Sequence, residues 1–521
     1  MAVNNNISEL DDCEFDNGCR QSYDIVPESD EVTYLSPLME QKKRELEQKI
    51  RDNFSAMVIL KDPNMNSNFF AGRNLPSFVK DFILKRYVSD DGSVDGAALT
   101  SFLDKVTPKQ AGIRGALQAN QELTLLTRFI IYVDLVHGVR RFGIPDLGIN
   151  TKEGIIPAYV YNNHLNDLVD GEKWGLIKIS LLPDEDREDR NHVEMVDYKP
   201  FKPYKSVDLD YLRQVRKSFT TQEWINMLLS AMEYEANGFD SDTEKIEFLT
   251  RLLIFVEPRL NVIELAPKGS GKSFVFGNLS KYGWLVSGGK VTRAKLFYDK
   301  QRQQNGMIKN HDFVAFDEIQ TIIFQEPAEI QAALKSYLES GKTTIDNNEF
   351  TSECGLMLMG NIPLTDDHMP RSERYFDSLP KSFQESALLD RFHCFIEGWK
   401  LPRINNGLIY KGWTLNMEYF SEILHELRTQ NSYSLVFEQI VQFPHNMDRR
   451  DYTAIKRICV AYMKILFPHW TTVDAVNLDE FECYCLDPAK HRRSIIRKQC
   501  HNIDPEFHVN EEMMNAVRVI R

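Results

Sequence analysis

Residues 264–276 read ELAPKGSGKSFVF and contain a loop with two glycines between two apolar segments. The apolar residues before the loop are typical of a buried strand, and those after it are typical of a helix. Glycines in such a loop let backbone N–H groups approach phosphate oxygens closely, and the helix that follows adds partial positive charge. The stretch therefore predicts a phosphate-binding loop (P-loop) within an α/β nucleotide-binding fold.

The P-loop pattern G-x-x-x-x-G-K-[ST] assigns a role to each polar residue of the loop. Lys272 is expected to contact the β- and γ-phosphates of ATP, and the Ser273 hydroxyl to ligate Mg²⁺. The other expected ATP-binding residues are Lys268, Gly269, Ser270 and Gly271. Ala266 stands where the pattern has its first glycine, a departure of one methyl group. The alternative is a glycine turn followed by an accidental Lys-Ser pair.

A second apolar segment, DFVAFDEI at residues 312–319, ends in two carboxylates. Asp317 at the end of a strand would hold Mg²⁺, directly or through water. Glu318 would orient and deprotonate the attacking water as general base. The alternative is a buried strand that ends in surface acids, but a P-loop upstream favours the catalytic interpretation.

A third apolar segment, GLMLMGNIP at residues 355–363, ends in Asn361. Its amide could hydrogen-bond the attacking water or the γ-phosphate, which is a sensor role. The alternative is a turn asparagine before Pro363. The sequence therefore offers Asn361 as a third catalytic candidate beside Asp317 and Glu318.

Two arginines further along the chain are candidates for contacts with ATP. Arg391, in the stretch LLDRFHCFI, precedes a strand and could reach the nucleotide of a neighbouring subunit to stabilise the transition state. The alternative is an ion pair with Asp390. Arg450 opens a helical stretch and could be a second sensor of ATP, or a plain surface arginine. Downstream, Arg492, Arg493, Arg497 and Lys498 form a basic cluster that we interpret as a solvated helix face.

Composition limits the classes of protein that this chain can be. It has 521 residues, 42% of them hydrophobic, and a net charge of −14. Residues 1–40 contain ten Asp or Glu and one Arg, so the remainder is close to neutral and an acidic pI does not exclude nucleic acid. The first residues lack the features of a signal peptide, and no apolar run reaches the length of a membrane span. Eight scattered cysteines fit reduced thiols, and we expect a cytoplasmic protein without a membrane partner.

Changes in pattern along the chain predict six segments. Residue spacing favours helices near both ends, β-branched and aromatic runs favour strands after residue 119, and alternating strand-like and helix-like runs surround the P-loop. Thr220 and Glu223 form a capping box that starts a helix. The segments are a disordered acidic head at 1–36, a helical region at 37–118, a small OB-like β-barrel at 119–182, a linker at 183–206, the ATPase core at 207–405, and a helical lid with C-terminal helices at 406–521.

The order of these motifs resembles that of AAA+ ATPases. Over roughly residues 40–500 the chain more specifically resembles the Lon-related AAA+ proteins of BREX phage-defence systems, the BrxL family. The stretches that carry the resemblance are NVIELAPKGSGKSFVF, LVSGGKVTRAKLFYD, FVAFDEI, LKSYLESGK, MLMGNIP and LLDRFHCFIEGWKLP. The resemblance implies an AAA+ core with a helical lid, ATP hydrolysis, a homo-oligomeric ring (a hexamer, or two stacked as a dodecamer), DNA association and antiphage defence alongside other defence proteins.

The chain departs from that family in one respect. Family members usually carry a Lon-like protease domain after the lid, whereas only about fifty residues follow the lid here and no Lon-type Asp-Gly-Pro-Ser-Ala-Gly stretch is found. We therefore expect no protease activity from this sequence.

Basic residues beside aromatic ones are the candidates for DNA contacts. In the β region Arg140 and Arg141 precede Phe142, Arg128 precedes Phe129, and Lys173 precedes Trp174, a combination that could track phosphates and stack bases. In the core, Lys290 and Arg293 lie close together in the stretch SGGKVTRAK. The alternative is that these basic residues pair with nearby acids and that the aromatics belong to the core. The partner could be duplex or single-stranded DNA.

Three functions fit these observations. The first is a ring-forming ATPase that binds DNA and uses ATP to translocate on it or remodel it in antiphage defence. The second is an ATP-switched DNA clamp or scaffold with little turnover. The third is a protein unfoldase, for which the stretch KLFYDK at 295–300 is the candidate aromatic pore loop.

Overall fold

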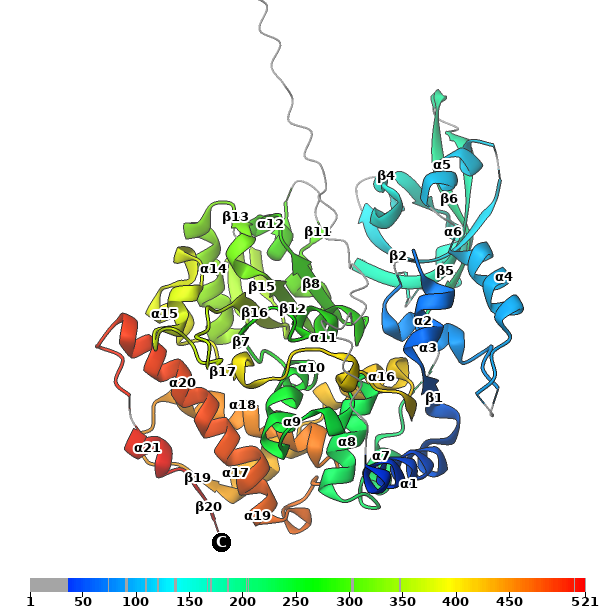
Figure 1. Ribbon diagram of the computed structural model, residues 1–521. Helices are drawn as coiled ribbons and strands as arrows, with labels where there is room; N and C mark the ends of the chain where they lie inside the picture. The colour runs from blue at the N-terminus through cyan, green and yellow to red at the C-terminus, as the bar shows by residue number, and fades with distance from the viewer. Residues whose placement is uncertain are drawn as a thin grey trace, which may run out of the picture.

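The computed structural model has an N-terminal helical region, a β-barrel, an α/β core and a helical lid (Figure 1). It describes residues 36–520 except 74, 90–91, 108–109, 120, 135–137, 166, 169–170, 185–186, 203, 205, 301–303, 346–347 and 510. The acidic head predicted at 1–36 lies outside the described residues, apart from Ser36, whose side chain caps the first helix.

The N-terminal region is helical, as its residue spacing predicts, with one strand added. Its elements are α1 (Pro37–Phe54), β1 (Val58–Lys61), α2 (Pro63–Phe70), α3 (Ser77–Leu84), α4 (Gly96–Val106) and α5 (Gln110–Gln118). Strand β1 pairs antiparallel with β18 (Gly412–Leu415), far along the chain. The N-terminal region is therefore joined directly to the segment that connects the core to the lid.

Five strands close into a small barrel in the order β2-β3-β4-β6-β5. They are β2 (Leu123–Asp134), β3 (Val139–Ile144), β4 (Ile149–Ile156), β5 (Gly171–Asp184) and β6 (Arg187–Pro200), with the short helix α6 (Ala158–Tyr161) between β4 and β5. The linker predicted at 183–206 is wrong over most of its length, because residues 187–200 form β6. Within β6, Val193 and Met195 alternate with polar residues and are buried in the barrel core.

The aromatic residues predicted to stack on DNA bases are buried within the protein. Phe129 and Phe142 are fully buried in the barrel core. A strand alternates its side chains between two faces, and Trp174 lies on the outer face of β5, where it is buried edge-on against Phe78 of α3. They contribute packing to the fold and offer no surface for stacking.

The α/β core is built on a five-stranded parallel sheet of order β17-β7-β16-β12-β8. Its strands are β7 (Val262–Ala266), β8 (Gly283–Ser287), β12 (Phe313–Asp317), β16 (Gly355–Asn361) and β17 (Cys394–Glu397). Successive residues of β7 face two different hydrophobic clusters, so both faces of the sheet are covered. Parallel strands buried on both faces read as continuous apolar runs, which is how the sequence revealed them.

Helices and short strands surround this sheet. The helices are α7 (Leu209–Arg216), α8 (Thr221–Ala231), α9 (Asp242–Leu249), α10 (Leu253–Val256), α11 (Lys272–Asn278), α12 (Arg293–Leu296), α13 (Met307–Asn310), α14 (Pro327–Ser340) and α15 (Ser386–Leu389). The short strands are β9 (Lys290–Val291), β10 (Tyr298–Asp299), β11 (Gln304–Asn305), β13 (Ile323–Phe324) and the hairpin β14 (Lys342–Ile345) with β15 (Asn348–Thr351). The capping box of Thr220 and Glu223 is present at the start of α8, as predicted.

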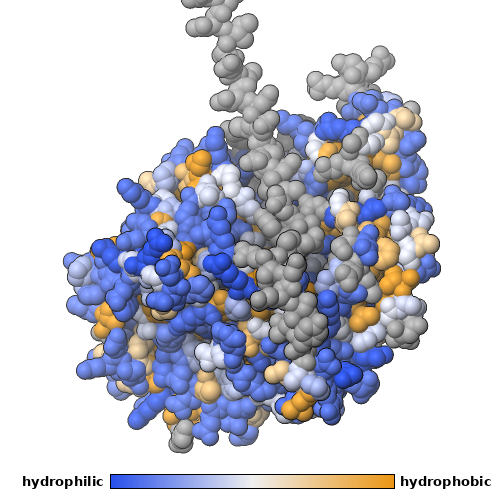
Figure 2. Space-filling model, viewed as in Figure 1, coloured by the Kyte–Doolittle hydropathy of each residue, from blue (hydrophilic) through white to orange (hydrophobic). Residues whose placement is uncertain are grey.

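The C-terminal region is a layer of helices against the core (Figure 1). It comprises α16 (Met417–Arg428), α17 (Ser432–Ile440), α18 (Arg449–Leu466), α19 (Leu478–Phe481), α20 (Asp487–Ile503) and α21 (Glu511–Asn515), with β19 (Val441–Gln442) paired to β20 (Arg518–Val519). Within the described part of the chain, none of the helices has the length and apolar character needed to cross a bilayer. On the face shown in Figure 2 hydrophilic residues predominate, and the apolar ones form small separate patches.

Candidate functional site

The glycines of the P-loop are required by its backbone conformation. Gly269 and Gly271 have φ of 80° and 74°, values in the left-handed region that favours glycine. A Cβ atom on Gly271 would lie 2.3 Å from the Tyr234 hydroxyl. The loop joins the end of β7 to the start of α11, so the strand, loop and helix order predicted from residues 264–276 is present.

Lys272 is buried beneath the loop, where its ammonium contacts neutral oxygens. Its Nζ donates to the carbonyl oxygens of Ala266 and Pro267 at 3.4 Å and to Asn361 Oδ1 at 3.1 Å. Burial lowers the pKa of this ammonium, while the more distant Glu264 and Asp317 act in the opposite direction. Among the described residues, no carboxylate oxygen lies within ion-pair distance of Nζ, so its charge is available to an anion.

Asn361 reaches this position because of the sheet register. It ends β16, and its partner in the ladder is Ala266, the last residue of β7. Gln320 holds its backbone from the other side, accepting from Asn361 N at 3.3 Å and donating to Asn361 O at 2.8 Å. The amide predicted to be a sensor therefore lies beside the P-loop lysine.

The carboxylates at the end of β12 lie beside the start of α11. The Ser273 hydroxyl donates to Asp317 Oδ2 at 2.5 Å, so the two predicted Mg²⁺ ligands are adjacent. Burial raises the pKa of Asp317, and the Ser273 hydrogen bond opposes that shift. Glu318 is exposed and has φ of 46°, a left-handed conformation that is uncommon for a residue with a side chain and recurs at functional sites.

A buried ion pair beneath the loop was not predicted from the sequence. Arg251 and Glu264 are both fully buried, with Arg251 Nη2 2.6 Å from Glu264 Oε1 and Arg251 Nε 3.1 Å from Oε2. Arg251 Nη1 also donates to the Ser270 carbonyl at 2.9 Å. The pair therefore ties the backbone of the loop to strand β7. The only signal in the sequence is Glu264 itself, a charge inside an apolar strand, which implies a buried partner.

The alanine that replaces the first P-loop glycine is accommodated by a glycine elsewhere. A Cβ atom on Gly398 would lie 2.3 Å from Ala266 Cβ and 2.9 Å from the Leu265 carbonyl. The absence of a side chain at residue 398 leaves room for the methyl group of Ala266. A few residues later, Ile404 N donates to Gly269 O at 2.8 Å, so the segment after β17 also supports the loop.

Arg391 lies at the opposite end of the sheet from its own P-loop. It precedes β17, and its carbonyl accepts from Asn261 Nδ2 at 3.4 Å, just before β7 begins. The P-loop follows the other end of β7, at Ala266. Five residues at about 3.3 Å each put about 16 Å of strand between these two points. The structure therefore separates Arg391 from Lys272, Asp317 and Asn361 of the same chain.

Arg450 lies with Arg391 instead of with the P-loop. Arg450 Nη1 is 2.9 Å from Asp390 Oδ2, and Arg450 Nη2 is 2.8 Å from Glu339 Oε2. Arg391 Nε is 3.0 Å from the same Glu339 oxygen. The two predicted ATP-contacting arginines thus share one carboxylate at the end of the sheet remote from their own P-loop, and the alternative pair of Arg391 with Asp390 does not form.

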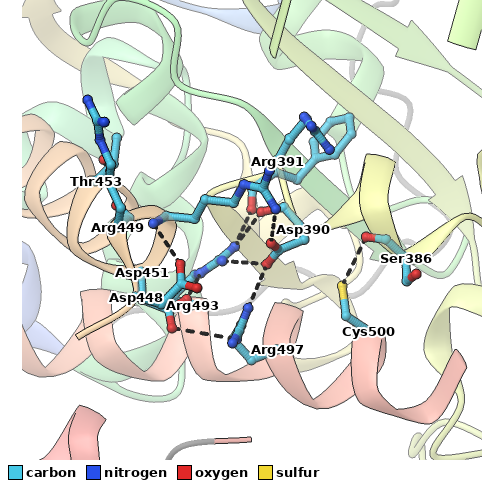
Figure 3. Close-up of polar contacts among 12 residues, drawn as sticks. Ser386, Asp390, Arg391, Asp448, Arg449, Asp451, Thr453, Arg493, Arg497 and Cys500 are labelled. Carbon is cyan, nitrogen blue, oxygen red and sulfur yellow. Dashed lines mark hydrogen bonds and ion pairs between the residues drawn. The ribbon is translucent and has the colours of Figure 1, made fainter. Parts of the chain in front are cut away.

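The basic cluster of α20 was interpreted as a solvated face, but its three arginines are buried and only Lys498 is exposed. Arg493 bridges Asp390 at 2.6 Å and Asp451 at 2.7 Å, and Arg497 is 3.1 Å from Asp390 (Figure 3). Arg492 pairs with Glu247 at 2.9 Å. The interpretation was wrong for the three arginines because their carboxylate partners come from distant segments of the chain. These ion pairs join the lid helices α18 and α20 to the core.

The four candidate DNA contacts form two separate pairs, one in the barrel and one in the core. Arg140 lies over the Tyr161 ring at 4.1 Å, and Arg141 Nη1 donates to the Lys152 carbonyl at 3.5 Å. In the core, Lys290 is exposed on β9, while Arg293 at the start of α12 is 3.4 Å from Glu329. Arg128, which also precedes an aromatic residue, is buried and pairs with Asp146 at 2.8 Å.

The residues around the loop fit a nucleotide with Mg²⁺. The Lys272 ammonium has no close counter-charge among the described residues, and the buried Ser270 hydroxyl has no hydrogen-bond partner there. Ser273 and Asp317 supply oxygen donors, which are the ligands Mg²⁺ prefers. The site therefore has cationic and neutral donors for phosphate and an acidic oxygen for the metal.

Two family models match the chain. Residues 193–513 match the model described as "Lon-like protease BrxL-like, ATPase domain", which covers more than half of the chain. Residues 52–181 match the model described as "BREX system Lon protease-like protein BrxL N-terminal". The chain belongs to the BrxL family.

Curated members of the BrxL family are similar to the chain over most of its length. The "Lon-like protease BrxL" of Escherichia coli O9:H4 (strain HS) is 26% identical over 462 residues, covering 87% of this chain and 64% of the relative. The protein of the same name from Bacillus cereus (strain H3081.97) is 26% identical over 429 residues, covering 81% of this chain and 62% of the relative. The chain thus spans less than two thirds of the length of these BrxL proteins. The match to the BrxL ATPase domain includes the whole P-loop site.

Proposed function

We propose that this BrxL-family chain is an AAA+ ATPase that uses ATP binding and hydrolysis to act on DNA in BREX-type antiphage defence. The observation that carries the proposal is the convergence of Lys272, the Ser273–Asp317 pair and Asn361 at one edge of the parallel sheet, with Glu318 next in the chain. The strand order, with the P-loop strand β7 between β17 and β16, supports an AAA+ core. The five-stranded barrel is consistent with an OB-like module.

Each residue of the site has a distinct part in the proposed reaction. Bound ATP would supply the γ-phosphoryl group, and bound Mg²⁺ would neutralise charge on the phosphate oxygens. Lys272 and the backbone N–H groups of the P-loop would hold the phosphates, and Ser273 with Asp317 would hold the metal. Arg251 donates a hydrogen bond to the Ser270 carbonyl and so stabilises the backbone conformation of the loop.

Glu318 and Asn361 act on the attacking water. Glu318 is exposed and follows the metal-binding Asp317 directly, so its carboxylate can accept a proton from water next to the phosphates. Asn361 donates or accepts a hydrogen bond that orients the same water while it also contacts Lys272. Glu318→Gln keeps the size of the side chain and removes the base.

We propose that the catalytic site is completed by a neighbouring subunit. Arg391 lies about 16 Å of strand away from its own P-loop, so it can stabilise a transition state only at the site of another copy. Arg450, held by the same carboxylate, would act on that site too. This requirement supports a homo-oligomeric ring, hexameric or stacked as a dodecamer.

Steady-state ATP hydrolysis by three proteins tests the reaction. The parent chain should hydrolyse ATP in a Mg²⁺-dependent manner. Lys272→Ala should lose ATP affinity, because its ammonium no longer meets the phosphates. Glu318→Gln should bind ATP as tightly as the parent but turn it over at least tenfold more slowly, since a positioned general base contributes about 10²–10⁴-fold. A Glu318→Gln protein with unchanged turnover would refute the general-base assignment.

DNA is the proposed substrate, held by charge and without base stacking. Lys290 and Arg293 in the core and Arg140 and Arg141 in the barrel are the proposed phosphate contacts, and a ring would repeat them in every subunit. Because Phe129, Phe142 and Trp174 are buried, the barrel would track the backbone only. Binding should therefore depend little on sequence and weaken steeply with salt.

Salt titrations of DNA binding test this path. We compare duplex and single-stranded DNA for the parent, for a chain lacking residues 1–36, and for a variant with Arg140, Arg141, Lys290 and Arg293 changed to Gln. Removal of the acidic head should tighten binding, and removal of the four charges should flatten the dependence of log affinity on log salt. If the charge-removal variant binds with the slope of the parent, DNA follows another path.

Two alternative functions remain distinguishable by experiment. A DNA clamp would use the same P-loop but show little turnover, and DNA would leave its ATPase rate unchanged. A protein unfoldase needs an exposed aromatic pore loop, but in the candidate stretch at 295–300 Phe297 is fully buried and Tyr298 is half-buried. Stimulation of ATP hydrolysis by DNA, and not by unfolded protein, would favour the first proposal over both.

A further inference from the structure

Glu339 makes contacts that no part of the proposed reaction yet uses. It lies near the end of helix α14, and a single oxygen, Oε2, receives both Arg391 and Arg450, the arginines proposed to act at a neighbouring site. Arg450 Nη2 and Nε lie at 2.8 and 3.1 Å, and Arg391 Nε lies at 3.0 Å. One carboxylate thus occupies two guanidinium groups at once.

The backbone behind these arginines is held by a different and more buried set of contacts. Asp390, the residue before Arg391, is buried and receives Arg493, Arg497 and Arg450. Arg493 also donates to the carbonyl oxygens of Asp390 and Phe392 at 2.9 and 2.8 Å (Figure 3). The lid therefore fixes the main chain on both sides of Arg391.

The Glu339 carboxylate, which receives both Arg391 and Arg450, is much more accessible to solvent than Asp390. The exposed fractions are 44% for Glu339, 35% for Arg450 and 16% for Arg391. Apart from Glu339, Arg391 donates to the Ala387 carbonyl within its own turn. Exposed ion pairs are weak and exchange readily with other partners. The contacts with Glu339 can thus break while the backbone stays in place, although Arg450 Nη1 remains held by Asp390 at 2.9 Å.

We propose that Glu339 is a latch that holds Arg391 and Arg450 within the subunit until the phosphates of a neighbouring subunit's ATP displace it. The inference rests on the proposed function, because it requires the catalytic site to be shared between subunits. Glu339 itself touches neither ATP nor the reacting atoms, so it is a positioning residue. It makes assembly of the shared site a competition between a carboxylate and a phosphate for the same two arginines.

Removing the Glu339 carboxylate should change the affinity of the protein for ATP, because this carboxylate competes with the phosphates for the two arginines. Each exposed ion pair contributes little, so losing both contacts should change ATP affinity by about two- to fivefold. The latch opposes engagement in the ATP-bound state as well as in the transition state. Its loss should therefore lower KM for ATP and leave kcat nearly unchanged.

The first test compares Glu339→Gln with a matched control. Glu438→Gln removes a comparable exposed pair, Glu438 with Lys456, at 48% exposure, in lid helix α17. In Glu339→Gln, KM for ATP should fall by about two- to fivefold with kcat within twofold of the parent, whereas Glu438→Gln should behave as the parent. An unchanged or raised KM in Glu339→Gln, or an equal fall in the control, would overturn the latch.

The second test asks whether Glu339 acts through the arginines. Affinity for adenylyl imidodiphosphate, a non-hydrolysable ATP analogue, is measured with and without Glu339→Gln in two backgrounds: the parent and Arg391→Ala/Arg450→Ala. Binding should tighten in the parent background and stay the same in the double background. Equal tightening in both would mean that Glu339 acts on the nucleotide in another way, and the latch would be wrong.

Turnover of Arg391→Ala separates failure of the latch from failure of the proposed function. If Arg391→Ala loses most of its turnover while Glu339→Gln leaves KM unchanged, the shared site stands and only the latch is refuted. If Arg391→Ala hydrolyses ATP like the parent, the shared site is refuted, and the latch falls with it.

Discussion

Replacing Arg251 by Met tests how much the P-loop depends on the buried pair beneath it. Arg251→Met keeps an unbranched side chain of similar length but leaves Glu264, which is 0% exposed, without its partner. Leaving one member of a buried ion pair uncompensated costs about 3–5 kcal/mol. The Ser270 carbonyl also loses the hydrogen bond from Arg251. We therefore expect a large loss of stability together with weaker ATP binding.

A second substitution separates the two effects. In Arg251→Met/Glu264→Leu the buried charge is gone, and replacing a buried pair by apolar residues is often neutral or stabilising. Stability should therefore largely recover. ATP binding should not, because the Ser270 carbonyl still lacks its donor, and one lost hydrogen bond of about 1 kcal/mol corresponds to about fivefold in affinity.

Urea denaturation followed by tryptophan fluorescence measures the stability of the parent and both variants, and titration with a fluorescent ATP analogue measures affinity. If Arg251→Met unfolds at the urea concentration of the parent, the proposed role of the buried pair is refuted. It is also refuted if the double variant, once stable, binds the analogue as tightly as the parent, because the Ser270 contact would then not support the loop.

Three further predictions concern the packing and protonation of the chain. Gly398→Ala should weaken ATP binding and cost about 1–3 kcal/mol of stability, because its Cβ would lie 2.3 Å from Ala266 Cβ. Ala266→Gly on that background should restore both in part, since the Leu265 carbonyl at 2.9 Å still crowds the new Cβ, and no rescue in thermal and binding assays would contradict the packing argument. Burial raises the pKa of Glu418 to about 8, so the folded chain binds a proton at this carboxyl more tightly than the unfolded chain does. The stability that protonated Glu418 contributes should therefore be lost as pH rises through about 8. Glu418→Gln should flatten that decline, and an identical pH profile of urea midpoints would count against it. Burial also raises the pKa of Asp317, so Mg²⁺-dependent ATP hydrolysis should decline on acidification at a higher pH than it would with an ordinary aspartate. Added Mg²⁺ should shift this decline back to lower pH, because the metal competes with the proton for the carboxylate. A pH profile of ATP hydrolysis that is insensitive to Mg²⁺ would exclude Asp317 as a metal ligand.

Residues of the site that belong to local patterns could be predicted from the sequence. Lys272, Ser273, Asp317 and Asn361 each follow an apolar run, and parallel strands bring the ends of such runs to one edge of a sheet. The family resemblance and the capping box depended on contiguous residues in the same way. Patterns of this kind can be recognised in the sequence because their residues are neighbours along the chain.

Features that depend on residues far apart in the chain could not be predicted. Arg251 is 19 residues from the Ser270 carbonyl that it binds, and Arg493 is 103 residues from Asp390, so no local pattern marks either contact. The same limit explains why the α20 arginines looked solvated. In the barrel, the charged run that begins β6 disguised a strand whose inward residues, Val193 and Met195, are apolar. In this segment, the alternation of apolar and polar residues indicated a strand, and the run of charged residues wrongly indicated a linker.

Mixing two inactive variants tests most directly whether the catalytic site is shared between subunits. Lys272→Ala cannot bind ATP normally but keeps Arg391, whereas Arg391→Ala keeps an intact P-loop and lacks the arginine. In mixed assemblies, some interfaces combine the intact P-loop of one variant with the Arg391 of the other. Mixing should restore part of the ATP hydrolysis that neither variant has alone, in proportion to the number of such interfaces. Mixed assemblies, verified by co-purification of two tags, that remain as inactive as the separate variants would contradict a shared catalytic site.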